Sequence, residues 1–336
     1  MKTKIVYVLV SNEGDNYTEQ FFISSYSVKY YNPDATIFLL TDTRTENYLN
    51  RHCHNSLSYV DKIVSVDYPS DFDNKKRSRY LKTSVRNLIE GDYLFIDTDT
   101  IICDDLSSID YTNKQIAAVY DMHVPVNKHA SFNEIKYKSH IIGYELQETD
   151  EYFNSGIMFV KDTEQTREFY ESWQKNYKEA IKKGVSTDQQ ALLKTNSQYC
   201  IISELDASWN CQIINNIADL WNAKIIHYFC TGLKRNSGDP VYKFMSRSFL
   251  TQIRERGFVV DDELKRYVNN PRSLFTTPLV IISGDDMKIK YSLQYHLLSQ
   301  LFYRHNSLFE YFEKILTYCR KLKRSKFVSI KKNKIG

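Results

Sequence analysis

The sequence predicts an α/β protein: a mainly parallel sheet flanked by helices, with a helical C-terminal extension. Short β-branched or aromatic runs alternate with longer amphipathic stretches through the first two thirds of the 336 residues. Hydrophobic residues make up 42% and charged residues 26% of the chain, the balance of a folded globular protein. Beyond about residue 240 the apolar residues recur at helical spacing instead.

The elements of the α/β part follow in order along the chain. The runs that predict strands are residues 5–10, 36–40, 62–66, 93–96, 116–120, 156–160 and 225–228. A helix over 18–31 stops at Asn32-Pro33, and a second over 79–88 is closed by Gly91. Such alternation favours parallel pairing, which places ligands at the carboxyl ends of the strands.

The C-terminal part is predicted to hold two helices. One covers about 293–303, and the next starts at Ser307, which would form a capping box with Glu310. The apolar face of this second helix carries Leu308, Phe309, Phe312, Ile315, Leu316 and Cys319. We therefore divide the chain into an α/β domain, 1–240, and a mostly helical region, 241–336, that ends in a basic amphipathic tail.

Charge is concentrated in that tail. Of the 45 Lys and Arg residues, eight lie between Arg320 and Lys334; the other 37 face 41 Asp and Glu, which gives the body a net charge of −4. A nucleic-acid-binding body is therefore not indicated. The N-terminus lacks a signal-peptide pattern and no apolar run reaches about 18 residues, so a cytoplasmic protein is expected. Six cysteines without a C-x-x-C pair are expected to be reduced thiols.

The run from Tyr93 to Ile102 carries the strongest chemical signal. It is an apolar strand that ends in Asp97-Thr98-Asp99, followed by another apolar pair. In extended structure Asp97 and Asp99 share a face, and a divalent cation would remove the repulsion between their carboxylates. Hard oxygen ligands with open positions suit Mg²⁺ or Mn²⁺ bridging a diphosphate. The alternative is that the motif is only a polar strand end.

Five further segments, taken together, resemble a known family. They are Ser11-Asn12 with Tyr17, Tyr152 to Ile157, Thr187 to Gln190, Leu205 to Asn210, and Ile225 to Tyr228 with Gly232 and Lys234. Together with the D-x-D strand, these segments follow one another in the order found in family-eight retaining glycosyltransferases of the GT-A type. The chain resembles that family across about residues 4–235. That group includes bacterial lipopolysaccharide galactosyl- and glucosyltransferases. The loop after His227 is longer here than in the family and lacks its Trp.

The resemblance implies a GT-A catalytic domain over 1–240 and a role for each motif. It implies a nucleotide-diphosphate sugar donor, UDP-Gal or UDP-Glc, Mn²⁺ or Mg²⁺ as cofactor, a glycan or lipid-linked glycan acceptor, and retention of anomeric configuration. Asp97, Asp99 and His227 would bind the cation. The residues expected at the transferred sugar are Asp188, Gln189, Asn154 and Asp121. Those expected to bind the nucleotide and its diphosphate are Ser11, Asn12, Tyr17, Lys82, Thr98, Ser155, Gly156, Gly232 and Lys234.

Individual residues also have structural interpretations. His227 alone reads as a structural histidine and Asp188 as a helix N-cap. Tyr17 reads as a core aromatic, whereas Lys82 and Arg86 read as a solvated helix face. No Asp or Glu can be assigned as a covalent nucleophile, so we expect front-face attack, with a diphosphate oxygen accepting the acceptor's proton; double displacement stays open.

Two other function classes compete with the transferase. In a haloacid-dehalogenase-type phosphatase, D-x-D-x-T supplies the nucleophile, here Asp97, and residues 280–286 resemble its late acidic motif. About ninety residues of α/β pattern precede the motif here, whereas that fold opens with it. The third candidate is a non-enzymatic membrane-surface adaptor that acts through the basic tail, which would be favoured by a degenerate D-x-D motif.

The tail itself predicts a peripheral contact with an anionic membrane. An apolar helix face from Ser307 and the eight basic residues that follow it would act at one site, over 307–334. This would place the enzyme on the inner face of the cell membrane, beside a lipid-linked acceptor. The alternative is that the apolar face docks on the catalytic domain and the basic residues form a solvated tail.

Overall fold

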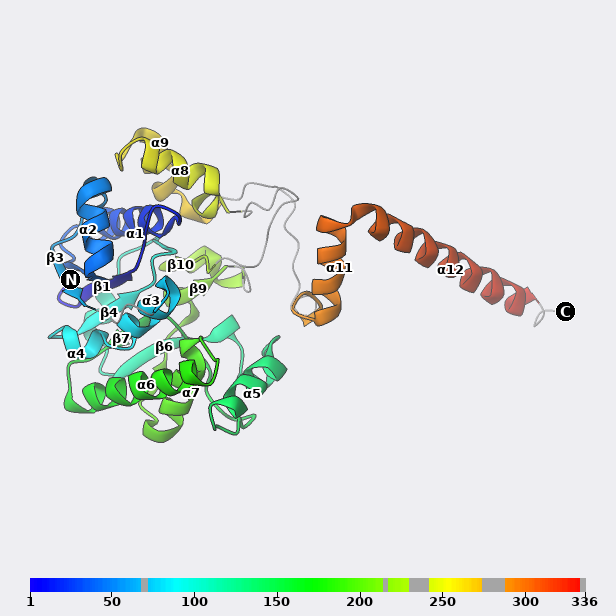
Figure 1. Ribbon diagram of the computed structural model, residues 1–336, viewed down its shortest axis with the longest axis horizontal. Helices are drawn as coiled ribbons and strands as arrows, with labels where there is room; N and C mark the ends of the chain where they lie inside the picture. The colour runs from blue at the N-terminus through cyan, green and yellow to red at the C-terminus, as the bar shows by residue number, and fades with distance from the viewer. Residues whose placement is uncertain (68–71, 214–216, 230–241, 274–287, 333–336) are drawn as a thin grey trace. The chain divides into compact units, whose positions relative to one another are not determined.

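The computed structural model describes residues 1–67, 72–213, 217–229, 242–273 and 288–332 (Figure 1). The chain forms two compact units, Met1–Val280 and Ile281–Gly336. The first unit holds the sheets and the helices that cover them. The second consists of helices in its described part.

A seven-stranded sheet forms the centre of the first unit, in the order β3-β2-β1-β4-β7-β6-β8. Its strands are β1 Lys4–Leu9, β2 Ile37–Asp42, β3 Lys62–Val66, β4 Tyr93–Ile96, β6 Ile116–Tyr120, β7 Phe153–Val160 and β8 Ile202–Glu204. Every neighbouring pair is parallel except those that β7 makes with β4 and β6. The predicted mainly parallel sheet is therefore confirmed.

A smaller sheet lies beside it, in the order β5-β10-β9. Its strands are β5 Thr100–Ile102, β9 Cys211–Gln212 and β10 Ile225–His227. Only three residues, Asp97-Thr98-Asp99, separate the end of β4 from the start of β5, so the chain passes from the large sheet to the small one through them. The pairing of β10 with β5 sets His227 opposite Thr100.

Helices cover both faces of the large sheet (Figure 1). In the first unit they are α1 Tyr17–Tyr31, α2 Thr43–His52, α3 Asn74–Lys82, α4 Val85–Leu88, α5 Phe132–Ile141, α6 Glu164–Lys182, α7 Asp188–Tyr199, α8 Arg247–Glu255 and α9 Asp262–Asn269. Along β1, Ile5 and Tyr7 pack into the core with α1 and α8, whereas Val6 and Val8 pack into the core with α6. This alternation is the period of two that a strand imposes.

Three local expectations are corrected. The helix predicted over 79–88 is two helices, α3 and α4, because the chain turns at Thr83-Ser84, where both hydroxyls bond back to the carbonyl oxygen of Tyr80. Asp97 and Asp99 were expected on one face of an extended strand, but they lie in the turn between β4 and β5. The last helix begins at Asn306, so Ser307 is inside it and does not cap it.

The boundary predicted near residue 240 falls in a segment outside the described residues. The compact units divide at Val280. Phe249, Leu250 and Ile253 of α8 and Leu264 and Val268 of α9 are buried in the core that includes α1. Residues 242–273 therefore belong with the first unit. That the catalytic domain itself ends near residue 240 stays a prediction.

The second unit contains α11 Leu293–Arg304 and α12 Asn306–Lys332, which contact each other. The Phe302 and Phe309 rings meet edge to face with centroids 5.1 Å apart. Large apolar side chains on both helices are exposed, among them Leu297, Leu308, Phe312 and Leu316. Among the described residues, no helix combines the length and the apolar character that crossing a membrane requires.

Candidate active site

The predicted site residues gather at one edge of the large sheet. Asp97 follows β4 and Asp121 follows β6, while Asn154 lies at the start of β7. Because β7 runs antiparallel to β4 and β6, its first residues lie at the edge where those two strands end. The backbone N–H of Asp97 donates to the carbonyl oxygen of Gly156 at 2.8 Å, which joins the two strands at this point.

A cleft of about 730 Å³ opens at this edge. Thirteen of the sixteen residues predicted for the site line it: Asn12, Tyr17, Lys82, Asp97, Thr98, Asp99, Asp121, Asn154, Ser155, Gly156, Asp188, Gln189 and His227. Ser11 does not line it, because its hydroxyl donates to Asp15 at 2.5 Å and accepts from Thr18 inside the fold. Gly232 and Lys234 lie outside the described residues. Tyr17 is half-exposed at the cleft, contrary to its reading as a core aromatic.

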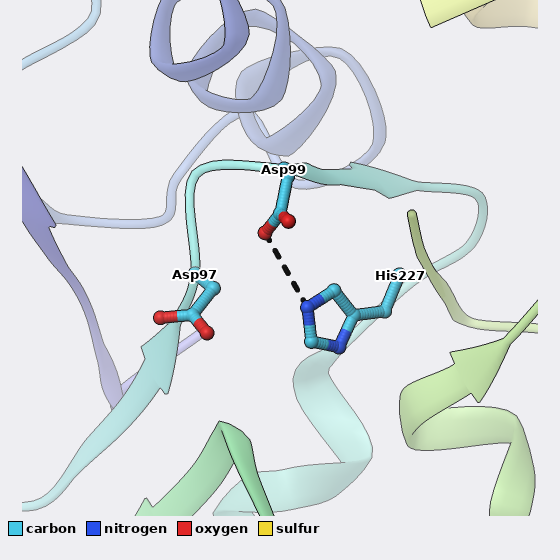
Figure 2. A group of neighbouring side chains, drawn as sticks. All are labelled: Asp97, Asp99 and His227. Carbon is cyan, nitrogen blue, oxygen red and sulfur yellow. Dashed lines mark ion pairs between the residues drawn. The ribbon is translucent and has the colours of Figure 1, made fainter. Parts of the chain in front are cut away.

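Asp97, Asp99 and His227 form a three-residue cluster in the cleft (Figure 2). One potential ligand atom from each lies within 4.8 Å of the other two. The His227 Nε2 atom is 3.3 Å from Oδ1 of Asp99, yet it is buried and has no hydrogen-bond partner among the described residues. Two carboxylates and an unpartnered imidazole nitrogen suit a divalent cation such as Mn²⁺, so the residues fit the cofactor that the sequence implied.

Gly156 permits this close approach. A β-carbon at position 156 would collide with Cε1 of His227 and would lie 2.9 Å from both Oδ2 of Asp97 and Oδ1 of Asn154. No side chain larger than hydrogen fits there unless the cluster moves apart. The glycine is therefore required by the packing of the cluster.

The two carboxyl groups of the cluster differ electrostatically. Burial raises the pKa of Asp97, and the neighbouring Asp99 raises it further, against the opposing effect of Lys82. Burial also acts to raise the pKa of Asp99, but His227 and Lys82 outweigh it and hold that pKa below its usual value. The cleft thus concentrates negative charge that a bound cation would offset.

Asp188 lies at the first turn of α7 and is surrounded by donors. Its carboxylate accepts from the Ser155 hydroxyl at 2.8 Å and forms ion pairs with Arg79 at 3.4 Å and Lys82 at 3.9 Å. Burial acts to raise the pKa of Asp188, but Lys82 and Arg79 together lower it, so the group is an anion at neutral pH. Thr187 occupies the N-cap position, so Asp188 is not the cap.

Lys82 also reaches the candidate cation site. Its ammonium group lies 3.1 Å from both carboxylate oxygens of Asp97. It is mostly buried, so it does not belong to a solvated helix face. Arg86 does not either: it is fully buried, bonds to the carbonyl oxygens of Ile89 and Gly91 and pairs with Asp162, which is a structural role.

Asp121 is held at the cleft by a strained turn. Met122 and His123, which follow it, both have a φ of 56°, a conformation that costs non-glycine residues free energy. The Met122 N–H donates to the Gln212 side chain at 2.7 Å, which helps to hold the turn. Asp121 accepts from His129 at 3.1 Å and from Asn154 at 2.8 Å, and these bonds outweigh burial and lower its pKa.

Sequence reasoning missed several residues of the cleft. Asp15, Ser78, Arg79 and Phe229 line it. Asn210 lies in a segment that carries the family resemblance, but the sequence assigned it no role, and it is the hydrogen-bond partner of His227. The helical spacing of Ser78, Arg79 and Lys82 was a usable signal, because i, i+1 and i+4 fall on one side of a helix. No local signal could have identified Asn210 as a partner of His227, because seventeen residues separate them.

Comparison with known proteins identifies the family. Residues 16–234 match the model of Glycosyl transferase family 8, which is more than half of the chain. No curated protein sequence matches the chain significantly.

Solved structures agree in fold. The galactosyltransferase LgtC, in complex with donor and acceptor sugar analogues, is 15% identical with a TM-score of 0.50, over 79% of this chain and 99% of LgtC. An active-site mutant of LgtC is 16% identical with a TM-score of 0.51, over 78% of this chain and 99% of the mutant chain. The bifunctional glycosyltransferase WbbM in its apo form is 16% identical with a TM-score of 0.51, over 80% of this chain and 51% of WbbM. The fold is thus GT-A, and the chain belongs to glycosyl transferase family 8 and is a glycosyltransferase.

Proposed function

We propose that the protein is a metal-dependent, retaining hexosyltransferase. It takes a hexose from a nucleotide-diphosphate sugar, UDP-Gal or UDP-Glc, and transfers it to a hydroxyl group of a glycan or glycolipid. The observation that carries this proposal is the Asp97, Asp99 and His227 cluster within a cleft of about 730 Å³. A cleft of this volume is in the range of small-ligand sites.

Each part of the cleft has a proposed task. Asp97, Asp99 and His227 hold Mn²⁺ or Mg²⁺, which supplies charge stabilisation to the departing diphosphate. Asn12 and Tyr17 contact the nucleoside, and Lys82 contacts a phosphate or the sugar. Asp121, Asn154 and Gln189 offer carboxylate and amide groups to sugar hydroxyls. These roles, and those of Ser11, Thr98, Ser155, Gly232 and Lys234 in nucleotide binding, remain predictions.

The surroundings of the carboxylates favour front-face attack. Asp188 is already engaged by Ser155, Arg79 and Lys82, and Asp121 by His129 and Asn154. Carboxylates whose oxygens are already engaged by hydrogen bonds and ion pairs suit positioning better than nucleophilic attack. In the proposed step the bond from the anomeric carbon to the diphosphate breaks, the acceptor oxygen bonds to that carbon on the same face, and a diphosphate oxygen takes the acceptor's proton.

A screen of nucleotide sugars without acceptor tests the donor and the metal. We expect UDP-Gal or UDP-Glc to be hydrolysed slowly, with activity removed by EDTA and restored by Mn²⁺. Asp97→Ala should abolish the hydrolysis while circular dichroism stays unchanged. Full activity of Asp97→Ala in EDTA would overturn the metal requirement. NMR of the glycosylated product then tests the stereochemistry, and an inverted anomeric centre would contradict retention.

The phosphatase interpretation fits the chain less well. The chain belongs to a glycosyltransferase family, and Asp97 lies beside a histidine and a second carboxylate in a cation-type cluster. The late acidic motif over 280–286 lies outside the described residues. The adaptor interpretation would need a degenerate D-x-D motif or a missing third ligand, and neither is found among the described residues.

We also propose that the second unit attaches the enzyme to the anionic inner face of the cell membrane. The exposed apolar side chains of α11 and α12 supply a hydrophobic anchor. The eight basic residues between Arg320 and Lys334 supply charge, and each contributes about 1 kcal/mol near such a surface.

Vesicle flotation tests the attachment. The full-length protein should float with anionic liposomes and less with neutral ones, and binding should weaken at physiological salt. A chain that ends at Cys319 keeps the apolar face and loses the charge, so its binding to anionic liposomes should fall. Equal binding by both chains at low and physiological salt would show that the basic tail is not an anchor.

A further inference from the structure

One line of hydrogen bonds runs beneath the cleft from Asp121 to His227. Asp121 accepts from Asn154 Nδ2 at 2.8 Å. Asn154 Oδ1 accepts from Asn210 Nδ2 at 3.0 Å, and Asn210 Oδ1 lies 3.0 Å from Nδ1 of His227. Asn154, Asn210 and His227 are all buried, so water does not offer alternative partners. The line therefore joins the sugar-binding side of the cleft to the cation cluster.

A backbone group determines the direction of these bonds. The N–H of Gly156 donates to one side-chain atom of Asn154 at 2.9 Å, and a backbone N–H can only donate. That atom must be the Asn154 oxygen. The Asn210 atom that faces the same oxygen must then be its amide nitrogen, because two oxygens would repel each other. The opposite atom of Asn210, the one beside His227, is consequently an oxygen.

The hydrogen bonds at the Asp121 end of the line are consistent with these directions. The backbone N–H of Ser131 donates to Nδ1 of His129 at 3.0 Å, so His129 carries its proton on Nε2 and donates it to Asp121. Asp121 is then acceptor at both of its oxygens. No bond in the line conflicts with its neighbours.

We infer that Asn210 is a positioning residue that selects the tautomer of His227. Its oxygen can only accept, so Nδ1 of His227 carries a proton, and in the neutral ring Nε2 then keeps its lone pair. Nε2 is the buried atom that faces Asp99 and has no hydrogen-bond partner among the described residues. The opposite tautomer would direct an N–H toward the cluster and would block a cation.

The consequence for the proposed cation site follows from general metal chemistry. A histidine that binds a metal is commonly oriented by a partner on its other ring nitrogen, and loss of such a partner costs about 10- to 100-fold in metal affinity. Asn210 is this partner here, and the same amide holds Asn154 in place. One residue therefore couples the geometry of the cation cluster to that of the sugar-binding side; this consequence rests on the proposed function, whereas the tautomer itself does not.

Nitrogen NMR of the metal-free, full-length protein tests the tautomer directly. With ¹⁵N-histidine labelling, the His227 signals are identified by their loss in His227→Gln. At a pH at which the ring is neutral, we expect wild-type His227 to carry its proton on Nδ1, and Asn210→Ala to give a mixture of tautomers. A wild-type proton on Nε2, or an unchanged tautomer in Asn210→Ala, would overturn the inference.

A matched variant controls for general loosening of the core. Asn176 is also buried and its amide donates to Thr195 at 2.9 Å, on helices away from the cluster. Asn176→Ala removes the same chemical group, and we expect it to leave the His227 tautomer unchanged. Asn210→Asp keeps an oxygen opposite Nδ1 and should retain the Nδ1 proton, whereas its second oxygen faces the Asn154 oxygen and loses that bond. It therefore tests the tautomer apart from the bond to Asn154, and it keeps the test decisive if Asn210→Ala does not fold.

Mn²⁺ titration in the presence of UDP, followed by electron paramagnetic resonance, separates the two proposals. We expect Asn210→Ala to bind Mn²⁺ about 10- to 100-fold more weakly than wild type, and Asn176→Ala to match wild type. If wild type binds no Mn²⁺, the metal part of the proposed function fails while the NMR result still decides the role of Asn210. Equal Mn²⁺ affinity of wild type and Asn210→Ala would overturn the positioning role.

Discussion

Packing around Gly156 controls how closely the cluster residues approach one another. The space that a β-carbon would need is occupied by the His227 ring and by oxygens of Asp97 and Asn154. Each of these side chains is also held by partners elsewhere: His227 by Asn210, Asp97 by Lys82, and Asn154 by Asp121. Displacement of one side chain of the cluster would therefore displace the others.

Gly156→Ala should consequently weaken cation binding far more than it weakens the fold. The added methyl group would displace the His227 ring, and we expect a loss of Mn²⁺ affinity of at least about 10-fold in the presence of UDP. Gly184→Ala is the matched control. Gly184 has a φ of 82° and open space around its Cβ position, so alanine there should cost about 1–2 kcal/mol of stability and no Mn²⁺ affinity. Equal Mn²⁺ affinities for the two variants would contradict this account.

Asp99→Asn should separate charge from shape in the cluster. The amide keeps the size of the side chain but removes the negative charge that attracts a cation, so donor hydrolysis should fall by about 100-fold or more. Asp262→Asn, on a fully exposed side chain of α9, is the control and should leave the rate unchanged. Initial rates with saturating Mn²⁺ measure the effect. A rate within a few-fold of wild type would remove Asp99 from the proposed ligand set.

At the scale of elements, α8 supports the loop between β1 and α1. The Arg254 guanidinium on α8 donates to the carbonyl oxygens of Glu13 at 2.8 Å and Asp15 at 2.5 Å, and it pairs with the fully buried Glu19. Asn12, Asp15 and Tyr17 of this loop and the adjoining helix line the cleft. A helix beyond residue 240 thus shapes the part of the cleft proposed to bind the nucleoside.

Arg254→Met should lower both stability and nucleotide affinity. The variant leaves Glu19 buried without its cation, which costs about 3 kcal/mol, and frees the loop that the guanidinium holds. We expect a lower urea midpoint and a UDP affinity reduced several-fold. Arg256→Met, two residues along on the exposed side, loses only surface ion pairs with Asp261 and Glu263 and serves as control. Unchanged UDP affinity in Arg254→Met would show that α8 does not shape the nucleoside site.

At the scale of the whole molecule, buried carboxylates on separate elements link the stability of the fold to pH. Asp121 and Asp188 are both buried or nearly so, and their hydrogen bonds and ion pairs lower both pKa values below 3.8 despite burial. A carboxylate whose pKa is lowered in the folded state stabilises that state above the unfolded pKa, and the contribution disappears as pH falls through the folded pKa. The same residues that shape the cleft therefore contribute to acid sensitivity.

Urea unfolding in EDTA should show this dependence. The midpoint should change little between about pH 7 and pH 5 and should decrease as pH falls below about 4. In Asp188→Asn the decrease should be smaller, because one of the responsible carboxylates is absent, whereas Asp262→Asn should behave like wild type. A slope in Asp188→Asn as steep as that of wild type would show that Asp188 is not among the groups responsible.

Much of the fold could be predicted from local pattern. The strands at 62–66, 93–96 and 116–120 have the predicted bounds, and the first helix differs by one residue. The strands at 93–96 and 116–120 are almost wholly buried between cores on both faces of the sheet, so each is a short continuous apolar run. The short strands β5, β8 and β9 were not predicted, because two or three residues carry no period of their own; β10, equally short, was predicted from its apolar run. The break between α3 and α4 depends on side-chain bonds to the backbone, which periodicity does not register.

The sequence by itself determined the order of the motifs, the family resemblance and the residue types of the cation cluster, because each of these depends on the residue types within short segments. Only the tertiary structure decided how Asp97 and Asp99 meet, which is through a turn between two sheets. It also decided that Arg254 shapes the cleft and that Asn210 is the partner of His227. These contacts join residues from 17 to 241 positions apart, and such pairings arise from the packing of whole elements, which a local pattern does not contain.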